Sequence, residues 1–432
     1  MRGTNKKFRW VYVMVFFIFM TLHHIDVVLL GPVASQILNS FAINQQVMDS
    51  LTLLGIFLAG ICFLVWGYLY DSYSRRRLLA LSGLLWGVIS WLIGLAPTYT
   101  TFAVSYVASA SANTGYSGIY SLVSDIFSPR QRGKITGLLL ATQTIAFLLA
   151  TILIEILDIG NYWRVTILLA GSMGFLMAFV VLWVIRDPKR GQSDPALSEM
   201  EIKGNYIFDK DIAKKMIKNP AMILLWGAGF FAIIPWTVIS QKMFPYLTVL
   251  RGLSQIDVYL IMLPALMALT LGYPIGGMLG DLLFIYKRRG RIIISIAGIV
   301  LATLCLYLSF SVTDLRGLDF LTLLTFSGLF MALEQPNLFA TLFDITLPEI
   351  RSSAIAVFMV FQLAGMTVGS AMMDYFAAKI GLGSAILWVS TGSWGVSLLF
   401  LIGLLFLLPE EIERLRKHLA YRSQLEARFD AE

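Results

Sequence analysis

Twelve long apolar runs limit what this chain can fold into more than any other feature. They occupy residues 10–38, 50–70, 78–96, 101–127, 134–157, 164–185, 220–249, 255–283, 292–312, 319–346, 353–378 and 385–408. A helix needs about 20 apolar residues to cross the roughly 30 Å hydrocarbon layer of a bilayer. Because backbone groups in lipid must be satisfied within the segment, we expect each run to be a membrane-spanning helix. The sequence therefore predicts an all-α polytopic membrane protein with twelve transmembrane helices.

The composition supports this prediction. Hydrophobic residues make up 58% of the 432 residues and charged residues only 14%, whereas a soluble domain carries roughly a quarter charged residues. The net charge of +7 would also suit a nucleic-acid-binding protein. However, the basic residues lie in loops between apolar runs, so we expect a lipid bilayer and no nucleic acid as partner.

The distribution of basic residues predicts the topology. Of the 33 lysines and arginines, 28 lie in segments that alternate counting assigns to one side, and only Arg164, Arg251, Arg316 and Lys379 lie on the other. Basic residues accumulate in cytoplasmic loops of membrane proteins. We therefore expect both termini in the cytoplasm and the chain in the plasma or inner membrane.

The domain organisation follows from the one long polar segment. It separates an N-terminal six-helix bundle at 1–185 from a C-terminal six-helix bundle at 220–408, and a charged tail occupies 409–432. The segment itself, 186–219, is a predicted cytoplasmic linker in which Ile212 to Ile217 favour a short surface helix. A passive tether is the simplest role for this linker, and a regulatory or lipid-contacting role is the alternative.

Two loop patterns occur once in each half, which indicates a duplicated six-helix unit. In the first pattern a glycine stands four residues before an aspartate and basic residues follow, as in Gly67, Asp71, Arg75 and Arg76 and again in Gly277 and Asp281. The second pattern is Asp-Ile-x-x-Pro-x-x-Arg, with copies 219 residues apart, and contains Asp125 and Arg132, then Asp344 and Arg351.

These motif residues are candidates for a gate between the halves. Glycine lets two helices pack closely, and an aspartate at the membrane edge can face a helix N-terminus or an arginine of a neighbouring loop. Such contacts can close one side and break when the halves rock. Charges that merely end helices are the alternative, but simple termination does not require the same spacing twice.

The motifs resemble the loop signatures of the major facilitator superfamily, and the resemblance covers essentially the whole chain. It implies two pseudo-symmetric six-helix bundles around a central cavity, with alternating access by rocking. Some features are also similar to the spinster-like group: residues 23–26, Trp163-Arg164, the segment 186–191 and residues 218–220. That group is associated with export of lysophospholipids and sphingolipids in some members. Ala112 stands where the group tends to carry an acid.

Polar side chains within the predicted spans are the candidate substrate or proton-coupling residues, because a charge inside a span costs about 2.5–3.5 kcal/mol on insertion scales. They fall on the first, fourth, seventh and tenth runs, which the resemblance implies line the cavity. They are His23, His24, Asp26, Asn113, Tyr116, Gln241, Lys242, Glu334, Gln335 and Asn337.

Asp26 lies about midway along the predicted first span, where it could exchange a proton as access alternates. His23 stands three residues earlier on roughly the same helix face and could relay that proton. A structural pair that pins two helices is the alternative. Glu334 is a second coupling candidate or a partner for Lys242. Lys242 could instead attract an anionic head group or extend to the outer surface.

The sequence predicts a secondary active transporter for a small organic or amphipathic solute, coupled to a proton. An uncoupled facilitator and a non-transporting sensor or receptor on the same scaffold are the alternatives. The sequence contains no phosphate-binding loop of the Gly-x-x-x-x-Gly-Lys-Ser/Thr type and no His-Glu-x-x-His motif. We therefore expect no enzyme activity, no cofactor and no metal, and a monomer is the default for this scaffold.

Overall fold

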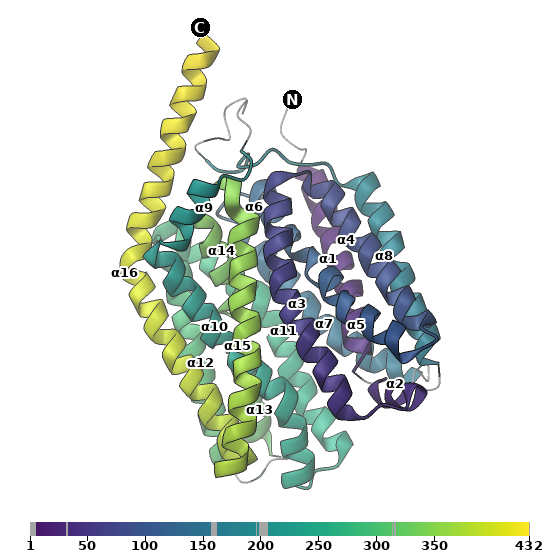
Figure 1. The fold of residues 1–432 in the computed structure, drawn as a ribbon. Helices are drawn as coiled ribbons and strands as arrows, with labels where there is room; N and C mark the ends of the chain where they lie inside the picture. The colour runs from purple at the N-terminus through teal and green to yellow at the C-terminus, as the bar shows by residue number, and fades with distance from the viewer. Residues whose placement is uncertain are drawn as a thin grey trace.

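The computed structural model describes residues 6–31, 33–156, 162–195, 197, 206–312, 314 and 317–431, and the regular structure in them is helical (Figure 1). The helices of the first half are α1 (Lys6–Leu29), α2 (Ala34–Phe41), α3 (Gln45–Ser72), α4 (Arg75–Leu95), α5 (Tyr99–Asn113), η1 (Gly115–Ser117), α6 (Gly118–Ile126), α7 (Arg132–Ile156) and α8 (Trp163–Val184). Those of the second half are α10 (Pro220–Pro245), η2 (Tyr246–Leu250), α11 (Gln255–Tyr286), α12 (Gly290–Ser311), α13 (Leu318–Met331), α14 (Gln335–Asp344), η3 (Pro348–Ile350), α15 (Arg351–Ile380) and α16 (Leu382–Ala431). The linker carries α9 (Lys210–Ile217), which confirms the predicted surface helix.

The helices form two bundles that meet along two long contacts. In the first bundle α4 packs on α8 and α1 on α7; in the second α10 packs on α16 and α11 on α13. The bundles touch mainly where α7 lies against α11 and α3 lies against α15. Helix α1 begins and α16 ends at the same face, at the top of Figure 1. We call it the terminal face; the loops that follow α3, α6, α11 and α14 lie on it.

Eleven helical segments in the described part of the chain are long and apolar enough to cross a membrane. The predicted fourth span, 101–127, is not among these segments, and the structure divides it into α5, η1 and α6. The tenth predicted span is also divided, into α13 and α14. The expectation of continuous helices at these two spans is therefore wrong.

Glycine and proline stand at the two breaks. A Cβ at Gly115 would lie 2.4 Å from Cβ of Ser82, and one at Gly118 would lie 2.4 Å from the ring of Tyr70, so only glycine allows this close packing. The second break precedes Pro336, which stands in the first turn of α14. Proline lacks an N–H and cannot continue a helix from the preceding turn without distortion. Both predicted spans are thus interrupted along their length.

The first span is shorter than predicted. Helix α1 ends at Leu29, and residues 34–41 form the separate helix α2 instead of continuing to 38. Asp26 therefore lies in the last turn of α1, far from the terminal face, and its predicted position midway along the span is wrong. Helix α16 shows the opposite behaviour, because it continues from the membrane through the predicted tail as one helix.

Candidate gate and transport site

Two aspartates join the bundles at the terminal face by capping helices of the opposite bundle. The carboxylate of Asp71, at the end of α3, accepts hydrogen bonds from the backbone N–H groups of Ser352 at 3.0 Å and Ser353 at 2.7 Å, at the start of α15. Asp281, near the end of α11, accepts from Gly133 at 3.1 Å and Lys134 at 2.8 Å, at the start of α7. A carboxylate is stabilised at a helix N-terminus by free N–H groups and the helix dipole.

The motif glycines let the bundles approach to backbone contact beside these caps. A Cβ at Gly67 would lie 2.6 Å from Cβ of Ala356 in α15. A Cβ at Gly277 would lie 2.0 Å from the carbonyl oxygen of Gly133 in α7. Contacts below 3 Å are not tolerated by a real side chain, so both crossings depend on glycine. The two motif copies thus make the same kind of contact with the opposite bundle.

The remaining motif charges form a buried network around the caps. Asp125 pairs with Arg75 of its own bundle and, at 3.2 Å, with Arg351 of the other. In the second copy, Asp344 pairs with Arg291 of its own bundle and lies 3.8 Å from Arg132 of the first bundle. The network therefore has the same wiring in both copies.

Two assignments within this network differ from the sequence prediction. The backbone N–H of Arg76 donates to Asp187 of the linker and its guanidinium donates to the carbonyl of Leu182 in α8, so these bonds do not reach the second bundle. Arg291, which the motif analysis did not select, bonds to Asp281 at 2.6 Å. Its position in the first turn of α12 matches that of Arg75 in α4, and this would have been the signal to find it.

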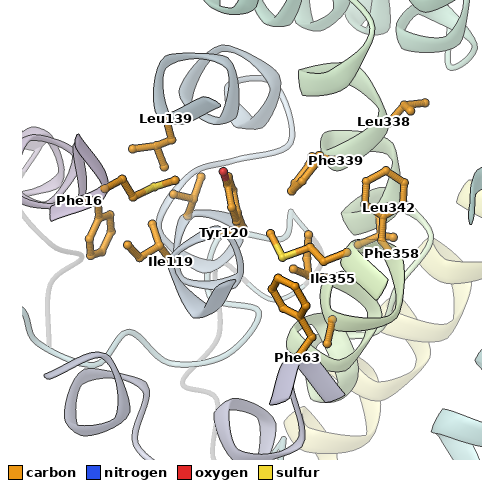
Figure 2. Close-up of a cluster of buried hydrophobic side chains, with 14 of the residues drawn as sticks. Phe16, Phe63, Ile119, Tyr120, Leu139, Leu338, Phe339, Leu342, Ile355 and Phe358 are labelled. Carbon is orange, nitrogen blue, oxygen red and sulfur yellow. The ribbon is translucent and has the colours of Figure 1, made fainter. Parts of the chain in front are cut away.

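An aromatic pair joins the two bundles further from the terminal face than the charged network. Figure 2 shows Tyr120 of α6 facing Phe339 of α14, with Phe63, Ile355 and Phe358 around them. The ring centroids of Tyr120 and Phe339 are 4.8 Å apart, and those of Phe339 and Phe358 are 5.1 Å apart. Tyr120 and Phe339 are separated by the same 219 residues as the motif copies. They are therefore equivalent residues of the two bundles that meet on the axis between them.

Polar groups lie one helical turn from this pair, at the two helix breaks. Tyr116, in η1, contacts the ring of Tyr120 at 6.5 Å and that of His24 at 5.4 Å. Its equivalent in the second bundle is Gln335, whose side chain accepts a hydrogen bond from Gln362 of α15 at 2.9 Å. Breaks in spanning helices are where transporters of several folds bind their solutes. Tyr116 and Gln335 thus stand at the two breaks, with His24 beside Tyr116; their role in binding stays a prediction, and Gln362 was not predicted.

Asp26 and His23 lie inside the first bundle. Asp26 is buried and accepts from Ser90 of α4 at 3.1 Å. It lines a small cavity together with Trp86, Ser109 and Asn113. His23 is buried among Phe19, Trp86, His24 and Tyr116, and neither of its ring nitrogens has a hydrogen-bond partner. No hydrogen bond links His23 to Asp26 directly, so the proposed relay would need an intervening group.

Glu334 and Asn337 lie inside the second bundle. The carboxylate of Glu334 is 2% exposed and accepts from Ser397 of α16 at 3.4 Å. The amide of Asn337 donates to the carbonyls of Gly276 in α11 and Leu333, which ties α14 to α11. Asn337 therefore has a structural position rather than one beside the aromatic pair.

Lys242 and Gln241 lie at the end of α10 that is far from the terminal face. Lys242 pairs with Asp374 of α15 at 2.7 Å, and Gln241 accepts from Ser370 at 3.1 Å. The predicted pairing of Lys242 with Glu334 is wrong, because the carboxylate of Glu334 instead contacts α16 at Ser397. Asp374 was overlooked although it lies inside the predicted span 353–378. Among the residues that the structure describes, no group of three or more His, Cys, Asp or Glu is placed to bind a metal ion.

Comparison with known proteins agrees with this arrangement. The family model of the Major Facilitator Superfamily matches residues 16–324. The chain is 22% identical to a probable galactarate/D-glucarate transporter of Bacillus subtilis, over 67% of this chain and 68% of that protein. It is 24% identical to the cis,cis-muconate transport protein of Acinetobacter baylyi, over 56% and 58%. It is also 24% identical to protein spinster of Drosophila melanogaster, over 52% of this chain but only 36% of that protein.

Two solved structures are similar in fold. One is a bacterial homologue of the human lysosomal transporter spinster, in an inward-facing and unoccupied conformation, with a TM-score of 0.54 and 19% identity over 96% of this chain and 99% of the other. The second is a proton:xylose symporter bound to 6-bromo-6-deoxy-D-glucose, with a TM-score of 0.71 and 16% identity over 93% and 96%. At these identities the likeness concerns the fold, a multi-pass helical membrane protein of two bundles.

Proposed function

This chain belongs to the Major Facilitator Superfamily, and from that premise we propose that it is a secondary active transporter that works by alternating access. The reciprocal capping of α15 by Asp71 and of α7 by Asp281 is the observation that carries the proposal. These contacts join separate bundles at one face only, so rocking of the bundles breaks them together. The excess of lysine and arginine supports a cytoplasmic location for the terminal face. The conformation described is then the one closed to the cytoplasm.

The proposed solute is small and organic or amphipathic. It would bind beside Tyr116, His24, Gln335 and Gln362. These residues lie on the side of the Tyr120–Phe339 pair that faces away from the terminal face. These groups offer aromatic faces and neutral hydrogen bonds. The one lysine predicted inside a span, Lys242, is already neutralised by Asp374. The relatives whose names include glucarate, muconate or spinster support an organic solute without selecting one.

Proton coupling is the proposed source of energy. Asp26 and Glu334 are buried carboxylates that accept hydrogen bonds from Ser90 and Ser397, and neither is paired with a cation among the described residues. An ionised carboxylate is costly in such a site unless it is paired. Each is therefore suited to bind a proton in one conformation and release it in another. Both carboxylates lie within their bundles rather than between them. Protonation would therefore affect transport by changing how α1 and α14 pack against their neighbours.

The experiment begins with purified protein in lipid and a thermal-shift screen of lysolipids, organic acids, sugars and amphipathic amines. A stabilising compound is then tested for uptake into proteoliposomes under an imposed pH gradient. We expect Asp26→Asn or Glu334→Gln to abolish gradient-driven accumulation while exchange of labelled solute continues. Asp319→Asn is the matched control, because Asp319 is an exposed carboxylate at the start of α13.

The outcomes separate the alternatives. Uptake that stops at equilibration in the unmodified protein, Asp26→Asn and Glu334→Gln alike, despite the pH gradient, would favour an uncoupled facilitator. Binding of a compound without any uptake or exchange would favour a sensor. Loss of binding in Gln335→Ala but not in Lys242→Ala would support the site beside the aromatic pair.

A further inference from the structure

One carboxylate of the linker bonds to both bundles at once. Asp194 accepts a hydrogen bond through one oxygen from Arg132 at 2.7 Å and through the other oxygen from Arg351 at 2.8 Å. These arginines close the two copies of the Asp-Ile-x-x-Pro-x-x-Arg motif and belong to different bundles. Asp194 is 4% exposed and both arginines are at most 1% exposed. Asp194, which lies outside the repeated motif, therefore pairs with the equivalent arginine of both motif copies.

Electrostatics makes Asp194 important for these two arginines. Arg132 and Arg351 lie close enough that their positive charges oppose each other. Removing one partner of a buried ion pair leaves an uncompensated charge, which is strongly destabilising. Burial alone would raise the pKa of Asp194, but Arg351 and Arg132 outweigh it and hold that pKa below its usual value. The group is thus ionised at neutral pH and balances both guanidinium groups.

The chain before Asp194 forms a turn that fits the gate. Gly191 has φ +73°, a conformation that favours glycine, and a Cβ there would lie 3.0 Å from Cγ of Pro348 in the loop after α14. The N–H of Gly191 donates to Asp125 at 2.8 Å. The N–H of Asp194 donates to the carbonyl of Gly191 at 2.9 Å. The turn therefore contacts motif residues of both bundles before it presents Asp194.

The chain after Asp194 is also anchored. Leu197 is 1% exposed and packs in a cluster with Tyr206 of the linker, Leu347 of the loop after α14 and Leu415 and Leu419 of α16. Arg422 of α16 pairs with Glu349 in the same loop. Residues 190–195 and 197 are thus held by contacts with both bundles. A linker that only tethers the bundles would not require these contacts.

We propose that residues 190–195 and 197 form a latch of the gate, in which Asp194 stabilises closure of the terminal face by neutralising Arg132 and Arg351 together. When the bundles rock apart, Asp194 must release at least one of these arginines, since each belongs to a different bundle. The inference rests on the proposed alternating access and extends it. The linker becomes a third part of the gate, beside the two motif copies.

The test measures closure without any solute. Spin labels are placed at Arg77→Cys, at the start of α4, and at Lys287→Cys, after α11, because both side chains are exposed and lie on different bundles. Cys62 and Cys305 are replaced by serine. Pulsed electron spin resonance in lipid nanodiscs then gives the populations of short and long distances. We expect Asp194→Asn to raise the ratio of long to short distances about 5- to 150-fold, the usual range for coupling between two sites.

Asp209→Asn is the matched control, because Asp209 is a linker carboxylate that caps α9 and asparagine caps equally well. It should leave the distances unchanged. Gly191→Ala, which disturbs the turn but keeps every charge, should act in the same direction as Asp194→Asn. If Asp194→Asn matches the control while Gly277→Ala opens the terminal face, the latch is refuted and alternating access stands. If no variant populates a second distance, the proposed function itself fails.

Discussion

Gly277→Ala is the sharpest test of how the terminal face closes. The added Cβ would lie 2.0 Å from the carbonyl oxygen of Gly133, a backbone atom that cannot turn aside. Non-bonded heavy atoms prefer about 3.5–4.0 Å, so α11 and α7 must separate locally by about 1.5 Å or more. Overpacking of this kind costs about 1–3 kcal/mol. The strain exists only while the bundles are closed, so the ratio of open to closed protein should rise about 5- to 150-fold.

The spin-label pair at positions 77 and 287 measures this ratio directly. Gly60→Ala is the control, because Gly60 lies on α3 with nothing within 4 Å of its added Cβ, and it should leave the distances unchanged. Gly67→Ala, the equivalent change on α3, should open the terminal face as well. An unchanged distance distribution in both Gly277→Ala and Gly67→Ala would refute the claim that glycine contacts set the closed state.

Three further predictions concern the aromatic pair, the Lys242–Asp374 ion pair and Asp194. Phe339→Ala should shift the same distances toward the open state, because loss of a buried phenylalanine costs about 3–5 kcal/mol, whereas Phe326→Ala on the exposed side of α13 should not; equal effects would contradict the central role of the Tyr120 pair. Lys242→Ala should lower thermal stability by less than about 1 kcal/mol, because Lys242 and Asp374 are 29% and 68% exposed, and a large fall in melting temperature would disprove this. Because the pKa of Asp194 lies below its usual value, its stabilising effect is present above about pH 4 and is lost only as pH falls through the lowered pKa. The charged groups that contact Asp194 are Arg132 and Arg351, which in turn pair with Asp344 and Asp125. Lowering the pH from about 7.5 to about 5.5 should therefore not abolish the effect of Asp194→Asn on closure. Disappearance of that effect at the lower pH would contradict an ionised latch.

The sequence alone was enough for the fold class. Apolar length predicts where helices lie because each helix in lipid satisfies its backbone groups by itself. The duplicated motifs predicted the family, which is confirmed. They also selected Asp71 and Asp281 as candidate gate residues facing a helix N-terminus or an arginine, and the gate role stays a prediction. The breaks in the fourth and tenth spans were missed although Gly115, Gly118 and Pro336 are visible in the sequence, because long apolar runs hide local interruptions.

Tertiary structure decided which side chains meet. The helices are apolar almost all round, so their sequences do not show which face turns toward the other bundle. Asp26 and Glu334 were expected on a shared path, but each contacts a serine within its own bundle. Asp194 looked like one charge in a polar linker until the fold placed it between Arg132 and Arg351. Helix formation depends on neighbours in sequence, whereas a buried charge needs partners that only the packing of distant segments can supply.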